Sequence, residues 1–221
     1  MTTVEEAVAL QEELAPQVIR TVPDGFSPKV AVGLDVAYGS DDLVAAAVCV
    51  DVATLEIVDS VAVRDVTDFP YVPGLFAFRE LPSLLKALDR LKVVPDVLVC
   101  DGQGIAHPRR FGLASHAGVV TGLPSVGVGK QALGHYDPPG PGRGDWTPLV
   151  DNDEVVGRAL RTQAGVKPVF VSIGHKIDLD TATELVLRLS PKYRLPETTR
   201  AADQLGRRVS AGGVGVQDVT D

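Results

Sequence analysis

The sequence has few cysteines and few aromatic residues, and it lacks long hydrophobic runs. The two cysteines, Cys49 and Cys100, lie in separate apolar segments and are not spaced as metal ligands, so we expect two buried thiols in a reducing compartment. No run approaches the roughly 18 apolar residues of a membrane span. Residues 1–20 carry four glutamates and lack the apolar centre of a signal peptide. These absences predict a cytoplasmic protein that does not enter the membrane.

The formal net charge is −8, which at first argues against a nucleic-acid partner. The charge is unevenly distributed, because residues 1–68 carry a net charge of −10 and residues 69–221 a net charge of +2. A local basic surface in the second part therefore remains possible. We expect its non-specific binding to a polyanion to be weak and to fade with salt.

An apolar content of 45% and an aromatic content of only 5% predict a full, mainly aliphatic core. β-Branched and alternating apolar segments bounded by turn residues predict strands at residues 29–38, 43–51, 55–63, 96–100, 125–128, 146–150, 154–161 and 168–173. Helical spacing predicts helices at residues 3–20, interrupted or kinked at Pro16, at 78–88, after Pro108, at 182–189 with Asp180 or Thr181 as N-cap, and from about Pro196.

Short connections make the first three strands antiparallel, and the next two should pair in parallel across helical crossovers. The fold class is therefore α/β, with a mixed sheet of three antiparallel strands followed by parallel strands and flanked by helices. Three antiparallel strands followed by helix, strand, helix and strand resemble the ribonuclease H-like fold. We expect one domain over residues 1–209, a monomer, and a disordered polar tail at 210–221.

The segment from residue 101 to 130 contains the densest group of candidate functional side chains. Asp101 follows an apolar strand directly, at the end where open α/β sheets bind ligands, and Gly102 and Gly104 allow a close backbone approach. A carboxylate there suits a metal ion that also contacts a phosphate, although an aspartate before glycine can simply cap a turn. Lys130 ends the next strand and would place a cation at the same edge of the sheet.

A segment rich in proline, residues 69–82, precedes the first long helix. Tyr71 lies between two prolines, so a stiff backbone would present its ring as a wedge or stacking platform for nucleic acid. The alternative is an ordered loop with Tyr71 packed on the core. Glu80 lies near the start of the helix, where a glutamate can also serve only as a partner of the helix dipole.

Five motifs in this order resemble the endonuclease V family of the ribonuclease H-like superfamily, over about residues 25 to 209. They are GLDVAY, PYVPGLFAFRELP, DGQGIAHPRRFGLASHAG, SVGVGK and SIGHKIDL. The resemblance implies catalytic roles for Asp35, Glu80, Asp101, Lys130 and His175, and metal binding by Asp35, Glu80 and Asp101. It implies a strand-separating wedge at Pro70, Tyr71, Val72 and Pro73, a lesion pocket at Gly74, Phe76, Gly102, Leu113 and Leu133, and contacts to the DNA backbone from His107, Arg109 and Arg110.

The chemistry agrees with this set, because hard carboxylate oxygens suit Mg²⁺, with Mn²⁺ as a substitute, rather than zinc. The resemblance implies double- or single-stranded DNA containing deoxyinosine as substrate, with the hypoxanthine base flipped out of the stack. It also implies cleavage of the second phosphodiester bond 3′ to the lesion, which leaves 3′-hydroxyl and 5′-phosphate ends.

Other functions are compatible with the same residues. An endoribonuclease acting on inosine in RNA would use the same carboxylates, and contacts to a 2′-hydroxyl would distinguish it. A protein that binds the lesion without cleavage would not need the three acids. A small-molecule enzyme that binds a nucleotide at Gly102 is disfavoured, since DGQG is not a dinucleotide-binding fingerprint.

Overall fold

The computed structural model describes residues 2–212, and its framework is one sheet of eight strands. Apolar alternation and β-branched residues form the strands β1 (Val30–Tyr38), β2 (Leu43–Asp51), β3 (Ile57–Asp65), β4 (Val97–Cys100), β5 (Ser125–Gly129), β6 (Trp146–Asp151), β7 (Glu154–Leu160) and β8 (Val169–His175). All eight lie within a few residues of the positions predicted from sequence.

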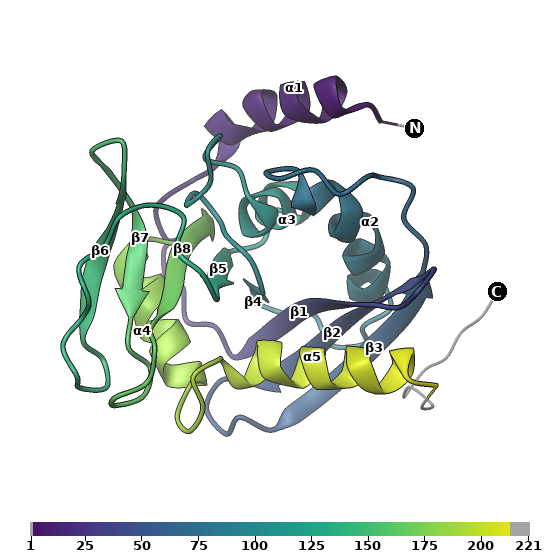
Figure 1. Ribbon diagram of the computed structural model, residues 1–221. Coiled ribbons are helices and arrows are strands. Elements are labelled where there is room, and N and C mark those ends of the chain that lie inside the picture. Colours follow the sequence, from purple (N-terminus) through teal and green to yellow (C-terminus); the bar gives the residue numbers. More distant parts are fainter. Residues whose placement is uncertain (1, 213–221) are drawn as a thin grey trace.

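The strands pair in the order β3-β2-β1-β4-β5-β8-β7-β6. The first three strands are antiparallel, and β1, β4 and β5 are parallel to one another, as predicted. Beyond them, β8, β7 and β6 add a second antiparallel group, because β8 runs opposite to β5. The outer hairpin of β6 and β7 extends the sheet on the left of Figure 1.

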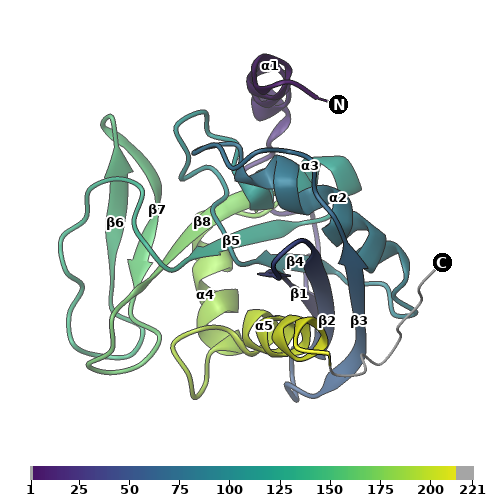
Figure 2. The ribbon, with the colours of Figure 1, turned by 45° about the vertical axis from the view of Figure 1, so that its right-hand side comes forward.

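Helices cover both faces of the sheet. On one face lie α2 (Phe76–Asp89) and α3 (Leu113–Thr121), and on the other α4 (Leu179–Leu189) and α5 (Glu197–Ser210), as Figures 1 and 2 show. Strand alternation supplies both cores: Val32 and Leu34 pack toward α2 and α3, whereas Ala31 packs in a second cluster with residues of α4. The fold is therefore a three-layer α/β sandwich.

The first helix, α1 (Val4–Leu14), lies outside this sandwich, on the side of α2 and α3 (Figure 1). The predicted capping box is present, since the side chains of Thr3 and Glu6 each bond the other's backbone N–H. The expected interruption at Pro16 is present, because the helix ends before this proline in a short 3₁₀ turn, η1 (Ala15–Gln17), and does not resume up to residue 20. A proline at this position removes a helical donor.

One close contact positions α5. A Cβ on Gly33 of β1 would lie 2.2 Å from the Thr198 carbonyl carbon, so only glycine at this position lets the start of α5 lie directly on the strand. The buried face of α5 then carries Ala202, Leu205 and Val209 onto β2 and its neighbours. The helix runs from this contact toward the strand end at which Asp35 lies.

Two predicted helix starts were wrong. The helix expected after Pro108 begins only at Leu113, because the chain first makes a turn in which Arg110 has a positive φ of 55°. The N-cap of α4 is Asp178, which accepts from the Thr181 N–H, rather than Asp180 or Thr181. No helix among residues 2–212 is long and apolar enough to cross a membrane. The predicted tail overlaps the end of α5 at Ser210, and residues 213–221 lie outside the described residues.

Candidate active site

Two aspartates from neighbouring parallel strands form the centre of a polar pocket. Leu34 of β1 is paired with Cys100 of β4, so the next residues, Asp35 and Asp101, lie side by side where the strands separate. The Asp101 N–H donates to the Leu34 carbonyl at 3.1 Å and continues the ladder by one bond. The predicted convergence of these two carboxylates at one sheet edge is therefore present in the structure.

Helices on the two faces of the sheet bring two further acids to the same pocket. Glu80 of α2 is 3% exposed, and Asp203 comes from α5 on the opposite face. We call this pocket the carboxylate site; it is lined by Asp35, Val36, Tyr38, Phe76, Glu80, Asp101, Lys130, Asp203 and Arg207. Four carboxylates thus converge where the sequence predicted three.

Sequence reasoning missed Asp203, although a signal was present. Asp203 lies one turn after the buried Thr199 and one turn before the buried Gly206, so helical periodicity puts it at the border of the buried stripe of α5. What the pattern does not contain is the direction of α5 across the sheet. That direction, fixed by the Gly33 contact, decides that this border faces Asp35.

Two of the crowded carboxylates, Asp35 and Glu80, have raised pKa values. Burial, a hydrogen bond with Asp101 and the negative charge of Asp101 raise the pKa of Asp35 to about 8. Burial also raises the pKa of Glu80 to about 8, even though the Tyr38 hydroxyl donates to Glu80 Oε1 at 3.0 Å and favours its ionised form. Without a cation, the cluster holds fewer negative charges than its composition suggests.

Side-chain cations already pair with two of the acids. Lys130 Nζ donates to Asp101 Oδ2, and this bond raises the pKa of Lys130 although burial alone would lower it. Arg207 donates from Nε to Asp203 Oδ1 at 2.8 Å, one turn along α5. The structure therefore brings Lys130 to the carboxylates, as the sequence predicted, and adds Arg207.

The donor set of the carboxylate site fits a hard divalent cation. Asp35, Glu80, Asp101 and Asp203 offer only oxygen ligands, which suits Mg²⁺ or Mn²⁺, and raised carboxyl pKa values are the response expected where cationic charge is insufficient. Within residues 2–212, no three acidic, histidine or cysteine side chains already stand in a metal-binding arrangement. Lys130 and Arg207 each bond one oxygen of their partners, Asp101 Oδ2 and Asp203 Oδ1.

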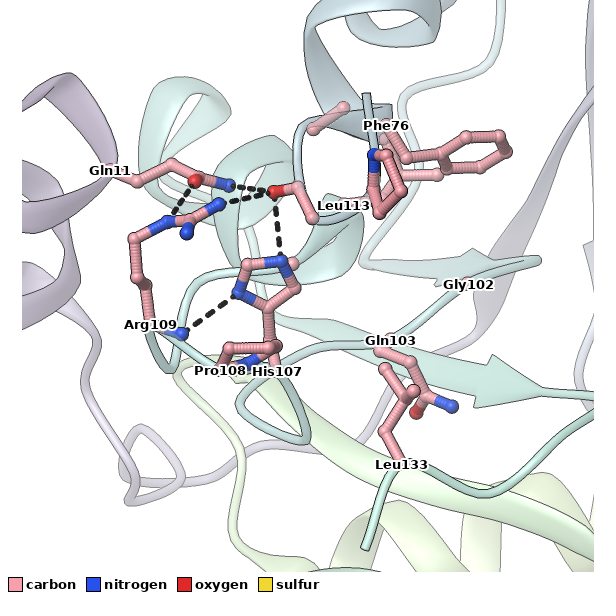
Figure 3. Close-up of a pocket in the computed structure, with 13 residues that line it drawn as sticks. Gln11, Phe76, Gly102, Gln103, His107, Pro108, Arg109, Leu113 and Leu133 are labelled. Atoms are coloured by element: carbon pink, nitrogen blue, oxygen red, sulfur yellow. Dashed lines mark hydrogen bonds between the residues drawn. The ribbon is translucent and has the colours of Figure 1, made fainter. Parts of the chain in front are cut away.

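A second cavity, of about 370 Å³, adjoins the carboxylate site. It contains all five residues predicted for a lesion pocket and has walls of backbone and apolar side chains (Figure 3). We call it the apolar pocket; it is lined by Gln11, Pro73, Gly74, Phe76, Ala77, Gly102, Gln103, His107, Pro108, Arg109, Gly112, Leu113 and Leu133. Its volume lies in the range of roughly 300–1,000 Å³ that is typical of small-molecule sites. Phe76 lines both cavities.

One wall of the apolar pocket is polar and fully ordered (Figure 3). The Gly74 carbonyl accepts from Gln11 Nε2 at 3.0 Å and Arg109 Nη2 at 2.8 Å, and it lies 2.9 Å from His107 Nε2. Because His107 Nδ1 accepts from the Arg109 N–H, its Nε2 carries the proton and donates. Burial lowers the pKa of His107 to about 4, so the ring is neutral at pH 7.

The predicted wedge projects from the rim of the apolar pocket. Tyr71 is 72% exposed, so it does not pack on the core. The segment is anchored on both sides, because the ring of Phe69 stacks on that of Phe78, with 5.5 Å between the ring centroids, and because Leu75 is buried. A hydrogen bond from the Leu75 N–H to the Val72 carbonyl closes the turn. The result is a fixed turn that presents an aromatic ring to solvent.

The residues predicted to contact the DNA backbone are engaged within the protein instead. His107 and Arg109 bond the Gly74 carbonyl, as described above. Arg110 donates to Asp151 at 2.7 Å and to Glu154 at 2.6 Å. The sequence shows a cluster of cations, but their partners come from distant elements, and two of the three build the apolar pocket.

His175 does not reach the carboxylate site. Because β8 is antiparallel to β5, its last residue pairs with Ser125, at the start of β5 and at the opposite edge of the sheet from Asp101. His175 is 5% exposed, and its Nδ1 accepts from the Ile19 N–H at 3.3 Å. The structure places it as an anchor for the segment that follows α1, and the predicted catalytic role does not fit this position.

Comparisons with known proteins agree on one family. Residues 12–204 match the family described as Endonuclease V. Endonuclease V of Nocardia farcinica is 56% identical over 219 residues, which cover 96% of each chain. The crystal structure of endonuclease V from Streptomyces avermitilis superposes with a TM-score of 0.92 at 54% identity, covering 96% of this chain and 95% of that one.

A more distant relative has been crystallised with nucleic acid. The structure of Ciona intestinalis endonuclease V holds a 24-mer DNA containing an inosine followed by a ribo-adenosine. It superposes with a TM-score of 0.83 at 28% identity and covers 95% of this chain and 98% of that chain. This likeness extends over the sheet and helices that carry both cavities described above.

Proposed function

Because the chain belongs to the endonuclease V family, we propose that it is a DNA-repair endonuclease specific for deoxyinosine. It cleaves the second phosphodiester bond 3′ to the lesion and leaves a 3′-hydroxyl and a 5′-phosphate. The Ciona relative, which binds DNA containing an inosine, supports this substrate. The substrate is double- or single-stranded DNA, and the damaged base remains in the cut strand.

The observation that carries the proposal is the adjacency of two unlike cavities. Phe76 lines both the apolar pocket and the carboxylate site, so a single DNA strand can place a base in one and its backbone in the other. A base must leave the stack to enter such a pocket. This arrangement explains why the cut falls near the lesion and yet not at it.

Recognition uses the apolar pocket and the wedge. The pocket accepts a planar base between Phe76 and Leu133, with Gly74 and Gly102 allowing backbone to approach its edges. Tyr71, exposed on its fixed turn, fills the gap that the flipped base leaves in the duplex. Apart from the Arg109 guanidinium in the pocket wall, both elements are uncharged, so recognition depends mainly on shape and stacking.

Cleavage uses the carboxylate site. Mg²⁺, for which Mn²⁺ can substitute, would be held by Asp35, Glu80, Asp101 and Asp203, and when bound it supplies charge stabilisation and an activated water. The oxygen of water forms a bond to phosphorus while the bond from phosphorus to the 3′-oxygen breaks. Lys130 neutralises the phosphate once it leaves Asp101. The 3′-oxygen takes up a proton, and the 5′-phosphate stays on the downstream strand.

A second candidate is an endoribonuclease for inosine in RNA. The specific observation in its favour is the ribo-adenosine that follows the inosine in the Ciona complex, because a 2′-hydroxyl beside the lesion is tolerated there. The carboxylates do not discriminate between the two substrates, since they act on the phosphate. A non-cleaving lesion-binding protein is disfavoured, because such a protein would not need the four acids that converge in the carboxylate site.

We further propose that the protein acts as a monomer in the cytoplasm. The free thiols of Cys49 and Cys100 are both buried in the sheet, which is consistent with a reducing compartment. Both cavities and the wedge are built from one chain, so a second copy is not required to complete the site. Gel filtration with light scattering at several concentrations would test the oligomeric state.

The proposed activity is tested with matched oligonucleotides that carry one inosine, as DNA and as RNA, in Mg²⁺ or in EDTA. Mg²⁺-dependent nicking of the DNA, with the RNA cut more slowly, is expected. Preferential cutting of the RNA would assign the protein to RNA metabolism with the same acids. Binding without any cutting would leave a lesion-binding protein and contradict the catalytic assignment.

A further inference from the structure

Helix α1 contributes one buried polar side chain to the wall of the apolar pocket. Gln11 is 1% exposed, and helical spacing places it on the face of α1 that carries Val4 and Ala7. That face packs against Phe69 and Leu75, which flank the wedge. A glutamine is unusual in an apolar stripe, because its amide loses its hydrogen bonds to water on burial and must form others within the protein.

The Gln11 amide joins three separate chain segments. Oε1 accepts from Arg109 Nε at 2.6 Å, and Nε2 donates to the Gly74 carbonyl at 3.0 Å and to the Phe111 carbonyl at 2.9 Å. Figure 3 shows the contact between Gln11 and Arg109 on one side of the pocket. The segments so joined are the turn after the wedge, the loop before α3 and α1 itself.

The Gly74 carbonyl is the point where these bonds meet. Gly74 has a positive φ of 80°, and a Cβ there would come within 2.9 Å of Arg109 Nη2. The residue therefore lies tightly beneath the guanidinium, between the wedge at Pro73 and the pocket wall at Phe76. Fixing its carbonyl fixes the relative position of the wedge and the pocket.

Gln11 makes no contact with the carboxylate site. Its partners, Gly74, Arg109 and Phe111, do not line that site, whereas Gly74 and Arg109 line the apolar pocket. Loss of the Gln11 amide would leave the Phe111 carbonyl and Arg109 Nε without this partner, which also costs stability, so the test has to separate stability from positioning. Because two of its three partners line the apolar pocket, the geometry points to a task in holding that pocket.

We propose that Gln11 is a positioning residue for lesion recognition, which holds Gly74 and Arg109 so that wedge and pocket engage the flipped base as one unit. This inference rests on the proposed function and extends it to the N-terminal helix. The acidic face of α1, with Glu5, Glu12 and Glu13, points away to solvent. The helix thus serves recognition through its buried side rather than through its charge.

The test compares wild type with Gln11→Met, which keeps the length of the side chain and removes its polar atoms. Fluorescence anisotropy in EDTA gives Kd for labelled DNA with deoxyinosine or deoxyadenosine, and Mg²⁺-dependent nicking gives KM and kcat. We expect Kd and KM for deoxyinosine DNA to rise about tenfold while kcat changes less than about twofold. The preference over deoxyadenosine should fall by a similar factor.

Two controls separate positioning from general stability. Glu12→Gln changes an exposed neighbour and should leave all values unchanged. Ala7→Gly loosens α1 at another buried position without removing a bond of Gln11, and it should change Kd much less. If Gln11→Met does not fold, Gln11→Glu retains the acceptor for Arg109 and sets a carboxylate against two carbonyl oxygens, which should weaken binding in the same way.

A double-mutant cycle tests which side chain transmits the effect of Gln11. If Gln11 acts through Arg109, then Arg109→Met should add little to Gln11→Met, so the two changes are not additive. Unchanged Kd and KM in Gln11→Met, with wild type showing its deoxyinosine preference, would overturn this inference alone. A loss confined to kcat would also overturn it. Absence of any deoxyinosine preference in wild type would refute the proposed function first.

Discussion

The carboxylate site and the apolar pocket share Phe76 but are built on opposite principles. The carboxylate site collects four acids, and two of them carry pKa values of about 8 until a cation arrives. Apart from the Arg109 guanidinium, the pocket is uncharged, and its polar wall already forms hydrogen bonds to the Gly74 carbonyl. The carboxylate site changes its protonation when it binds its ligand, whereas the hydrogen bonds of the apolar pocket are already formed before binding.

This difference implies that cleavage and recognition can be separated by mutation. Substitutions at the carboxylate site should act on the rate of the chemical step and on metal binding. Substitutions at the pocket or the wedge should act on Kd and KM.

Asp101→Asn should lower the rate of nicking by about 10³-fold or more, because it removes charge stabilisation worth several kcal/mol in the transition state. Binding of deoxyinosine DNA in EDTA should change less than about threefold. A denaturing gel and anisotropy on the same duplex measure both quantities. Asp180→Asn, at an aspartate whose side chain is 80% exposed, is the matched control. Equal losses of binding and cleavage would show that the two regions are not separable.

Metal-free protein should lose stability as the pH rises from about 4 to about 8. The raised pKa values of Asp35 and Glu80 mean that the unfolded chain releases protons which the folded state retains, a loss on the order of a few kcal/mol. Mg²⁺ should therefore raise the Tm more at pH 8 than at pH 5. Glu80→Gln should flatten the metal-free profile, and an unchanged profile in that variant would contradict the assignment.

The apolar pocket should respond to pH with the opposite sign. Burial lowers the pKa of His107 to about 4, so the unfolded state takes up a proton below pH 6.5 while the folded state does not. The His107 contribution to stability is then present above pH 6.5 and is lost as the pH falls toward 4, by about 3 kcal/mol. Burial also lowers the pKa of His116 to about 4, so urea unfolding of His107→Gln should show a smaller loss than wild type and still retain the His116 share. His135→Gln, at an exposed histidine, should retain the full loss.

Tyr71→Ala should weaken binding to duplex deoxyinosine DNA about tenfold, since a stacked aromatic ring is worth about 1–3 kcal/mol per base. The effect should be smaller on single-stranded deoxyinosine DNA, where no duplex gap has to be filled. Tyr71→Phe keeps the ring and should bind almost as wild type does. A larger loss on the single strand than on the duplex would argue against a wedge.

Tyr38→Phe should have the smallest effect. Removal of the hydroxyl that donates to Glu80 leaves this acid in place but less constrained. The Mg²⁺ concentration for half-maximal nicking should rise about threefold, in line with one lost hydrogen bond. Kd for deoxyinosine DNA in EDTA should not change, and a change there would link the two regions more tightly than the account allows.

Much of the fold and part of the site could be predicted from the sequence. Local patterns determine the strands, and an aspartate after a buried parallel strand lies at the binding edge wherever the sheet is built in this way, which is why Asp35 and Asp101 meet. The resemblance implied a catalytic role for His175, but a strand's own pattern does not say in which direction the strand pairs. β8 turned out to be antiparallel to β5.

The residues that sequence reasoning missed depend on packing between distant elements. Asp203 reaches the carboxylate site because Gly33 lets α5 lie against β1, and Gln11 reaches the pocket because α1 docks beside the wedge. Arg110 was assigned to DNA, since its partners Asp151 and Glu154 lie some forty positions further along the chain. Periodicity identifies the face of a helix, whereas the neighbour of that face follows from the tertiary structure.

If the two cavities act together, a base held in the apolar pocket places one particular phosphate in the carboxylate site. Mapping the nick in a 5′-labelled duplex with a single deoxyinosine, and asking whether DNA ligase reseals it, tests this coupling. We expect one Mg²⁺-dependent cut at the second bond 3′ to the lesion, with ends that ligase joins. Cuts scattered along the strand, or equal cutting of the matched deoxyadenosine duplex, would contradict it.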